Sequence, residues 1–499
     1  MKVQRLFQGA GIAALTLYPL YAPTLSNSSM ARMHSPLPLT DFALAMITNL
    51  ALVSLAVALL WICLERTRAA KWIRFCLPAM YVFFGAECFS LYRTDNAGVK
   101  RLLGIAGLAL CLTWVLYRVW PRTRRHVEFV CGKALGGLGI FCLLVVAQLL
   151  HLATWRPVPN FIEDRSLASA ISPEMRSRVV WILMDELSYN QVFAQRAAGL
   201  DLPNFDKFRQ SATVFTNVTP ATDATQTALP SLLLGRLVDR VGYTWDNRYL
   251  FATQGQSLQA FPASETPFAV ARNQGLTTGV VGWYNPYCSM LAPYADDCYW
   301  TYQANIPAVF VIGDGFWRNV GDAWLRYWIA VDHGQRDRAL VYQAKVYDDL
   351  TVRAKRILAQ DQPDFVFLHL PLPHPPGFYN RRTGQFESVN RASYLDNLAL
   401  ADKTLGELLA TMHASPRWAS TNIVLCGDHS WRTFVWRGTR HWTLEDEMAS
   451  RGGVFDPRPM LMVHQAGETT PATIDSSIPL IRVHDILDSL LRGEQPDFQ

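Results

Sequence analysis

Acidic residues and a histidine follow two short apolar runs of the chain, at the point where each run turns polar. The run "RVVWILMDE" delivers Asp185 and Glu186, and the run "TNIVLCGDH" delivers Asp428 and His429. Carboxylate and imidazole groups without thiolates are suitable ligands for zinc or manganese, and a carboxylate-rich site also admits calcium. Each pair alone is common at a helix cap or turn, but together they indicate a divalent-metal site.

Two further histidines belong to the same pattern. His374 ends the run "PDFVFLHLPLPH", and His441 lies twelve residues beyond His429. An imidazole near a metal can bind an anionic substrate or carry a proton. We therefore place both histidines at the site.

A threonine-rich loop, "NVTPATDATQTALPSLLLGR", runs from Asn217 into an apolar helix beginning near Thr227. Threonines serve turns and helix caps, and this is our interpretation of Thr216, Thr219, Thr222 and Thr227. A threonine hydroxyl can also be a nucleophile when a metal activates it. Asp223 is either a loop cap or a hydrogen-bond partner of the substrate.

The elements that position these residues have the pattern of a buried parallel sheet. Short apolar runs alternate with helical stretches, and two more runs of this kind are "LTTGVVGWYN" and "RPMLMVHQ". A helix over 394–413 has one apolar face and should cover the sheet; its leucines are Leu395, Leu398, Leu405, Leu408 and Leu409. Ligands bind at the carboxyl ends of such strands, where the polar residues lie.

The first third of the chain is different and has five apolar runs of roughly membrane-spanning length. They cover about 6–25, 39–63, 75–92, 102–118 and 133–155. The loops "ERTRAAKWIR" and "RVWPRTRRHVEFVCGK" carry four and five Lys or Arg, against one at 26–38 and three at 93–101. The positive-inside rule makes the two richer loops cytoplasmic and the region after Trp155 exterior. The first run could instead be a cleaved signal peptide, with the same exterior region.

Charge supports this division of the chain. Residues 1–155 hold 15 Lys and Arg against 5 Asp and Glu, which leaves 31 against 36 for the rest. The basic balance therefore belongs to the membrane part, where it suits anionic lipid and argues against a nucleic-acid protein. The single clearly intramembrane acid, Glu87, and the lack of paired broken helices argue against a transporter.

Cysteine usage agrees with an exterior domain. Six of the nine cysteines lie in or beside the apolar runs. Cys288 and Cys298 close a short loop and predict a disulfide in an oxidising compartment, whereas Cys426 is expected to be a buried thiol.

From about Val179 to Leu491 these motifs resemble the alkaline phosphatase/sulfatase superfamily, and within it the membrane-anchored phosphoethanolamine transferases and lipoteichoic acid synthases. The resemblance implies an α/β sandwich with a mostly parallel sheet, an acidic metal ligand after the first strand, a nucleophilic threonine at a helix start, and a late "DH" pair. Those transferases place the nucleophile after an "NV" and five residues before a proline, which here indicates Thr225.

Carried onto this chain, the resemblance implies a definite set of roles. The catalytic nucleophile is Thr225, and His374 and His441 bind substrate. The metal, zinc or else manganese or calcium, is held by Glu186, Asp185, Thr225, Asp428 and His429.

Three departures leave the substrate open. "TQTAL" lacks the Cys or Ser followed by "xPxR" from which sulfatases make formylglycine, the "GET" signature of phosphoethanolamine transferases is missing at Glu186, and "DHG" is "DHS". The following "SWRTFVWRGTRHW" contains Arg432, Arg437 and Arg440, which either bind phosphate or belong to a solvated loop.

The sequence thus predicts a transmembrane helical domain over 1–155 with about five helices, a linker over 156–178 and a sulfatase-like catalytic domain over 179–499. The resemblance implies a bacterial inner-membrane transferase with its catalytic domain outside. It would move phosphoethanolamine or phosphoglycerol from a phospholipid to a lipid-linked or glycan acceptor through a phosphothreonine intermediate. A hydrolase with the same site and a catalytically silent membrane scaffold are the alternatives.

Overall fold

The computed structural model describes residues 2–64, 67, 79, 99–120, 122–162, 177–301, 315–321, 332–387, 392–437, 442–468 and 470–498. The chain forms two compact units. Unit 1 comprises Met1–Ala31, Leu37–Arg156 and Ile306–Gln335, and unit 2 comprises Arg32–Pro36, Pro157–Asn305 and Arg336–Gln499. The predicted third span at 75–92, with Glu87, lies almost wholly outside the described residues, as does most of the linker.

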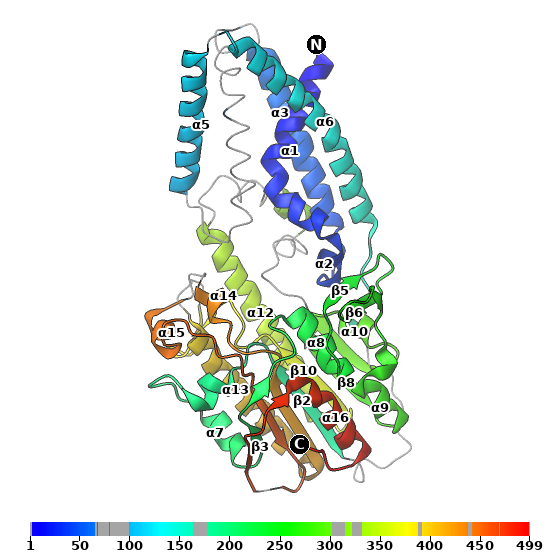
Figure 1. The fold of residues 1–499 in the computed structure, drawn as a ribbon. Helices are drawn as coiled ribbons and strands as arrows, with labels where there is room; N and C mark the ends of the chain where they lie inside the picture. Colours follow the sequence, from blue (N-terminus) through cyan, green and yellow to red (C-terminus); the bar gives the residue numbers. More distant parts are fainter. Residues whose placement is uncertain are drawn as a thin grey trace. The chain divides into compact units, whose positions relative to one another are not determined.

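Unit 1 is built from long helices (Figure 1): α1 (Lys2–Ser26), α3 (Thr40–Leu64), α5 (Val99–Val119) and α6 (Arg124–Thr154). Helices α1, α3 and α6 pack against one another. Glycines allow this close approach, because a Cβ at Gly139 would lie 1.9 Å from the Phe7 carbonyl oxygen and one at Gly11 would lie 2.2 Å from that of Leu135. Among the described helices, α3 and α6 are long and apolar enough to cross a membrane. The predicted fourth span contains a shorter apolar stretch, Gly107–Val119.

Unit 2 contains a nine-stranded mixed sheet in the order β1-β9-β8-β10-β2-β13-β14-β3-β15. Its centre is parallel and consists of β8 (Thr278–Trp283), β10 (Phe365–Leu370), β2 (Arg178–Met184) and β13 (Thr421–Gly427). The four strands are fully buried, as expected for a parallel sheet covered on both faces. The fifth predicted strand, β14 (Leu461–His464), runs antiparallel to both of its neighbours.

The remaining strands of this sheet lie at its two sides. On one side are β9 (Asp297–Thr301) and β1 (Phe161–Ile162), and on the other are β3 (Thr213–Phe215) and β15 (Ala472–Ile474). Three small sheets are separate from it: β5 (Arg240–Tyr243) with β6 (Tyr249–Ala252) and β7 (Gln259–Ala260), β11 (Tyr379–Asn380) with β12 (Gln385–Phe386), and β4 (Val218–Thr219) with β16 (Ile478–Pro479).

Helices cover both faces of the large sheet (Figure 1). One face packs against α13 (Tyr394–His413), α12 (Asp332–Ala359) and α7 (Pro203–Arg209). The predicted 394–413 helix is confirmed: a Ser393–Asp396 capping box begins it, and its five leucines are buried. The other side carries α16 (Val483–Arg492), which contacts β2 and β13, together with α8 (Thr225–Leu234) and α9 (Pro267–Asn273). The short helices are α2 (Ser28–Met33), α10 (Tyr287–Met290), α14 (Thr433–Arg437) and α15 (Leu444–Ala449).

Candidate active site

The carboxyl ends of β2 and β13 bring four of the predicted site residues together. Asp185 and Glu186 follow β2, and Asp428 and His429 follow β13; all four side chains are fully buried. The two strands are parallel neighbours, with Gly427 opposite Met184, so the residues after them must lie side by side. The sheet register therefore assembles the two pairs.

Thr225 is the first residue of α8 and reaches this cluster. Its hydroxyl donates to Asp185 Oδ2 at 2.9 Å, and its oxygen lies 3.3 Å from His429 Nε2. His429 Nε2 is in turn 3.2 Å from Asp428 Oδ2 and 3.6 Å from Asp185 Oδ1. A buried threonine hydroxyl at a helix start, where backbone N–H groups can receive an anion, has the placement that a nucleophile needs.

The remaining polar atoms of the cluster show that a cation fits there. Asp185 Oδ1 and Asp428 Oδ2 are buried and have no hydrogen-bond partner in the described part of the chain. Ligand atoms of Asp185, Asp428 and His429 lie within 4.8 Å of one another. Burial, followed by the neighbouring Asp428 carboxylate, raises the pKa of Asp185 well above its ordinary value. A divalent cation would relieve this repulsion.

Glu186 is oriented differently from the other predicted ligands. Arg432 Nε donates to Glu186 Oε1 and Trp436 Nε1 donates to Glu186 Oε2, both at 2.6 Å. The Tyr394 hydroxyl donates to the Glu186 carbonyl at 2.8 Å, and the Glu186 backbone is left-handed, with φ of 66°. Each carboxylate oxygen thus already accepts one hydrogen bond from the protein. We call Glu186, Arg432 and Trp436 the Glu186 clamp.

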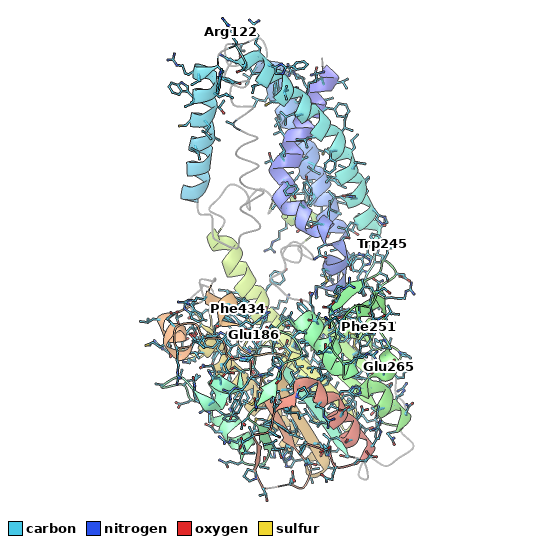
Figure 2. All side chains as sticks on the ribbon, in the orientation of Figure 1. Arg122, Glu186, Trp245, Phe251, Glu265 and Phe434 are labelled. Atoms are coloured by element: carbon cyan, nitrogen blue, oxygen red, sulfur yellow. A yellow bond between two sulfur atoms is a disulfide. The ribbon has the colours of Figure 1, made fainter. Side chains whose placement is uncertain are left out.

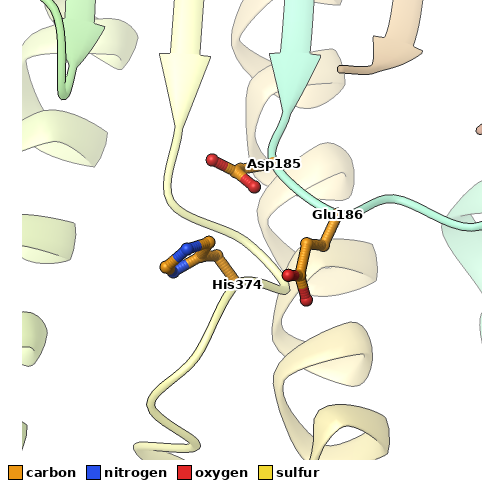
Figure 3. Close-up of side chains that lie close together, drawn as sticks. All are labelled: Asp185, Glu186 and His374. Carbon is orange, nitrogen blue, oxygen red and sulfur yellow. The ribbon is translucent and has the colours of Figure 1, made fainter. Parts of the chain in front are cut away.

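His374 lies beside Asp185 and Glu186 (Figure 3), and its ligand atom is within 4.8 Å of theirs. Its Nδ1 is 2.6 Å from the Pro375 carbonyl, and Asn397 donates to the His374 carbonyl. Burial, and then the charge of Arg432, lower the pKa of His374 well below its ordinary value, so the ring is neutral. His441, the other predicted substrate-binding histidine, lies outside the described residues.

The sequence reasoning missed His369, which lies inside β10. Its Nδ1 is 2.7 Å from the Tyr287 hydroxyl, and its Nε2 is 3.9 Å from Asp185 Oδ2 and has no hydrogen-bond partner among the described residues. Burial lowers its pKa to about 4, which leaves a neutral imidazole suitable for metal ligation. The strand register, which the sequence alone does not give, explains its position: His369 pairs with Leu183, two residues before Asp185, so it projects on the same face of the sheet.

The three predicted arginines have different environments. Arg432 belongs to the Glu186 clamp and also donates through Nη1 to the Asp223 carbonyl at 3.2 Å. Arg437 pairs with Glu447 at 2.8 Å, and Arg440 lies outside the described residues. Arg432 therefore connects the segments after β2 and β13 with the loop before Thr225. Figure 2 labels Glu186 and also Phe434 of α14, two residues after Arg432.

The predicted cysteine pair is joined in the structure. A disulfide connects Cys288 of α10 with Cys298 of β9, with the two Cα atoms 5.6 Å apart. Cys426 is a buried thiol that accepts a hydrogen bond from Trp181 Nε1 at 3.2 Å. Burial raises its pKa to about 12, so it is not a reactive thiolate.

Comparison with known families identifies the family of the chain. A model of the sulfatase family matches residues 177–453, more than half of the 499-residue chain. The chain therefore belongs to the sulfatase family. No curated protein sequence matches it significantly.

Several solved structures are similar to part of the chain. The phosphonate monoester hydrolase of Agrobacterium radiobacter is 15% identical over 64% of this chain and 74% of its own, with a TM-score of 0.38. The PsFucS1 sulfatase from Pseudoalteromonas sp. is 13% identical over 64% and 68%, with a TM-score of 0.43. Murine ectonucleotide pyrophosphatase/phosphodiesterase 5 is 10% identical over 64% and 98%, with a TM-score of 0.38.

Proposed function

We propose that the protein is a membrane-anchored, metal-dependent transferase. It moves a phospho-alcohol group, phosphoethanolamine or phosphoglycerol, from a phospholipid to a glycan or lipid of the cell envelope. The observation that carries this proposal is the Thr225 hydroxyl, 2.9 Å from Asp185 and 3.3 Å from His429 inside a buried cluster of potential metal ligands. A nucleophile of this kind forms a covalent intermediate that a second alcohol can resolve.

The N-terminal unit supports a lipid donor. Helices α3 and α6 have the length and composition of membrane spans. We propose about five spans, with the catalytic unit on the periplasmic or extracellular side of the plasma membrane, because the two loops richest in Lys and Arg fix the opposite side as cytoplasmic. A catalytic unit tethered to the bilayer has phospholipid as its most concentrated phosphodiester.

The nucleophile segment argues against sulfate-ester hydrolysis by the formylglycine route. The nucleophile segment "TQTAL" has neither the Cys or Ser nor the "xPxR" that generate the sulfatase aldehyde. A threonine oxygen bonded to phosphorus gives a stable diester, which suits group transfer.

The residues have distinct roles in this reaction. Asp185, Asp428 and His429 would hold the metal, with Glu186 and His374 close by, and a bound divalent cation supplies Lewis acidity and lowers the pKa of a hydroxyl beside it. The Thr225 oxygen forms a bond to phosphorus, and the bond from phosphorus to the diacylglycerol oxygen breaks. The Thr225 proton is transferred to the diacylglycerol oxygen. Asp185 Oδ2 and His429 Nε2 are the groups close enough to carry it.

The second step reverses the first with a different alcohol. The acceptor hydroxyl oxygen bonds to phosphorus, the bond between Thr225 and phosphorus breaks, and the acceptor proton returns to the Thr225 oxygen. Neutral His374 donates its Nδ1 proton to the Pro375 carbonyl, so its unprotonated Nε2 can accept the acceptor's hydroxyl proton as a hydrogen bond and orient that hydroxyl.

Mass spectrometry of the Thr225 peptide tests the proposal. Full-length enzyme incubated with phosphatidylethanolamine or phosphatidylglycerol, without acceptor, should carry a phospho-alcohol adduct on Thr225, and we expect phosphoethanolamine to accumulate more. Thr225→Ala protein is the control for adducts elsewhere. Bare phosphate on Thr225, with free phosphate released from a simple monoester, would replace the transferase by a hydrolase that uses the same residues.

A further inference from the structure

A pocket of about 380 Å³ lies beside the loop that carries the nucleophile. One wall is the continuous segment 217–223, and the other is made by Phe455, Pro457 and Arg458. None of the roles proposed above for the metal ligands and Thr225 uses this pocket. We refer to it as the loop pocket.

The loop pocket is directly connected to the nucleophile. Its wall ends at Asp223, two residues before Thr225, and the Asp223 carbonyl accepts a hydrogen bond from Arg432 of the Glu186 clamp. The Thr222 and Thr227 hydroxyls are hydrogen-bonded at 2.8 Å, which fastens the loop to the first turn of α8. A molecule in the pocket therefore lies next to a fixed segment that leads into Thr225.

Several polar side chains of the pocket have no protein partner. Asn217, Thr219 and Asp223 are exposed, and none of their side chains makes a hydrogen bond or ion pair within the described ranges. Between them they offer an amide, a hydroxyl and a carboxylate. These are the groups with which proteins hydrogen-bond a polyhydroxylated ligand.

The other wall combines two apolar residues with an arginine whose charge is already paired. Phe455 and Pro457 face the pocket with Pro220, and such surfaces pack against the C–H faces of a ring. Arg458 is bound to the Asp456 carboxylate through Nε at 3.0 Å and Nη2 at 2.7 Å, and it donates to the Thr216 carbonyl through Nη1. The unpaired charge in the pocket is the Asp223 carboxylate, which repels a phosphate group.

We infer that the loop pocket binds a neutral sugar of the acceptor, so that the enzyme transfers its phospho-alcohol to a glycan hydroxyl. This inference rests on the proposed transferase function. Three features of the pocket support it: hydrogen-bonding side chains that have no protein partner, apolar residues on the opposite wall, and one negative charge. In the second step, the sugar hydroxyl oxygen bonds to phosphorus as the bond to Thr225 breaks, and the sugar proton passes to Thr225.

The experiment uses full-length protein in detergent with phosphatidylethanolamine and phosphatidylglycerol as donors. Cellobiose, maltose and chitobiose are the sugar probes, and glycerol is the alcohol that lacks a ring. Diacylglycerol release reports the first step. Formation of the sugar that carries the phospho-alcohol group, with loss of the Thr225 adduct, reports the second step. At least one disaccharide should discharge the adduct with saturating kinetics and a KM at least tenfold below that of glycerol.

Variants locate the effect in the pocket. Asp223→Asn replaces a charged hydrogen-bond acceptor by a neutral amide, and Thr219→Val removes a hydroxyl. Each variant should raise the sugar KM about tenfold relative to the donor KM, because each weakens or removes one hydrogen bond to the sugar. Asp201→Asn, at another exposed aspartate, is the matched control and should leave the ratio of the two KM values unchanged.

The outcomes separate the two proposals. Two results would contradict the sugar site but not the transferase function. One is diacylglycerol release with a Thr225 adduct that no disaccharide discharges, and the other is a sugar KM that neither variant changes. Absence of both the adduct and diacylglycerol overturns the proposed function itself.

Discussion

At the scale of single residues, the threonines of the loop before α8 are distinguished by their partners. Thr222 and Thr227 bond to each other, and Thr216 donates to Asp475. Thr225 alone among the threonines of 216–227 is hydrogen-bonded to the carboxylate cluster. The side-chain geometry thus supports Thr225 as the nucleophile and a structural role for Thr222 and Thr227.

Thr225→Ala should abolish turnover while the protein stays folded, because in the proposed mechanism the hydroxyl oxygen is the nucleophile. The expected loss is on the order of 10³-fold or more in the rate of diacylglycerol release. Thr227→Ala, two residues further along the same helix, is the control and should lose far less. Comparable losses in the two variants would show that the effect comes from the loop conformation.

Asp428→Asn should lower the metal content of the purified protein, because it replaces a buried anionic oxygen by an amide. Inductively coupled plasma mass spectrometry of protein dialysed against a weak chelator measures this directly, and zinc is the expected metal. His369→Gln should reduce metal content less, since its Nε2 lies at the border of the cluster, 3.9 Å from Asp185. A full metal complement in Asp428→Asn protein would mean that the metal binds elsewhere.

At the scale of elements, the Glu186 clamp attaches α14 and its preceding turn to the end of β2. Arg432→Met removes the charge opposite a fully buried carboxylate, so we expect a loss of about 3–5 kcal/mol in stability. A lower midpoint of thermal unfolding would report it.

The double variant Glu186→Gln with Arg432→Met is the control, because it also removes the buried Glu186 charge that Arg432→Met leaves unpaired. It should recover much of the loss caused by Arg432→Met alone. A double variant no more stable than Arg432→Met would show that the loss does not come from the unpaired Glu186 carboxylate.

The elements that the sequence predicts well are those with a strong local pattern. The runs that became β2, β8, β10 and β13 are almost wholly apolar and end in polar residues, and the capped leucine face of α13 has a clear helical period. The direction of β14 was not predictable, because a buried run has the same composition whichever way it pairs.

The site was less predictable where partners come from distant segments. A histidine inside an apolar strand has no local signal, and the register of β10 with β2 is needed to place His369 beside Asp185. The bond from Trp436 to Glu186 joins residues 250 positions apart, which no spacing rule anticipates. The strand ends, by contrast, follow from the general rule for parallel sheets.

At the scale of the whole molecule, the prediction concerns topology. A reporter that is active only outside the cytoplasm should function when fused after Gln499, and one inserted near Arg124 should behave as cytoplasmic. The reason is the excess of Lys and Arg in the loops at 65–74 and 118–133 over those at 26–38 and 93–101. The reverse activities would place the Cys288–Cys298 disulfide in a reducing compartment and remove the argument for an exterior phospholipid donor.

The buried carboxylates after β2 and β13 also bear on how the enzyme matures. Two acidic side chains packed together without a compensating cation disfavour the compact state at neutral pH, so uptake of the ion supplies folding free energy as well as reactivity. An exterior catalytic unit would acquire that ion after export, from whatever supply its surroundings offer. Scarcity of the metal would then lower the amount of intact enzyme through degradation of the unfilled form, in addition to leaving molecules inactive.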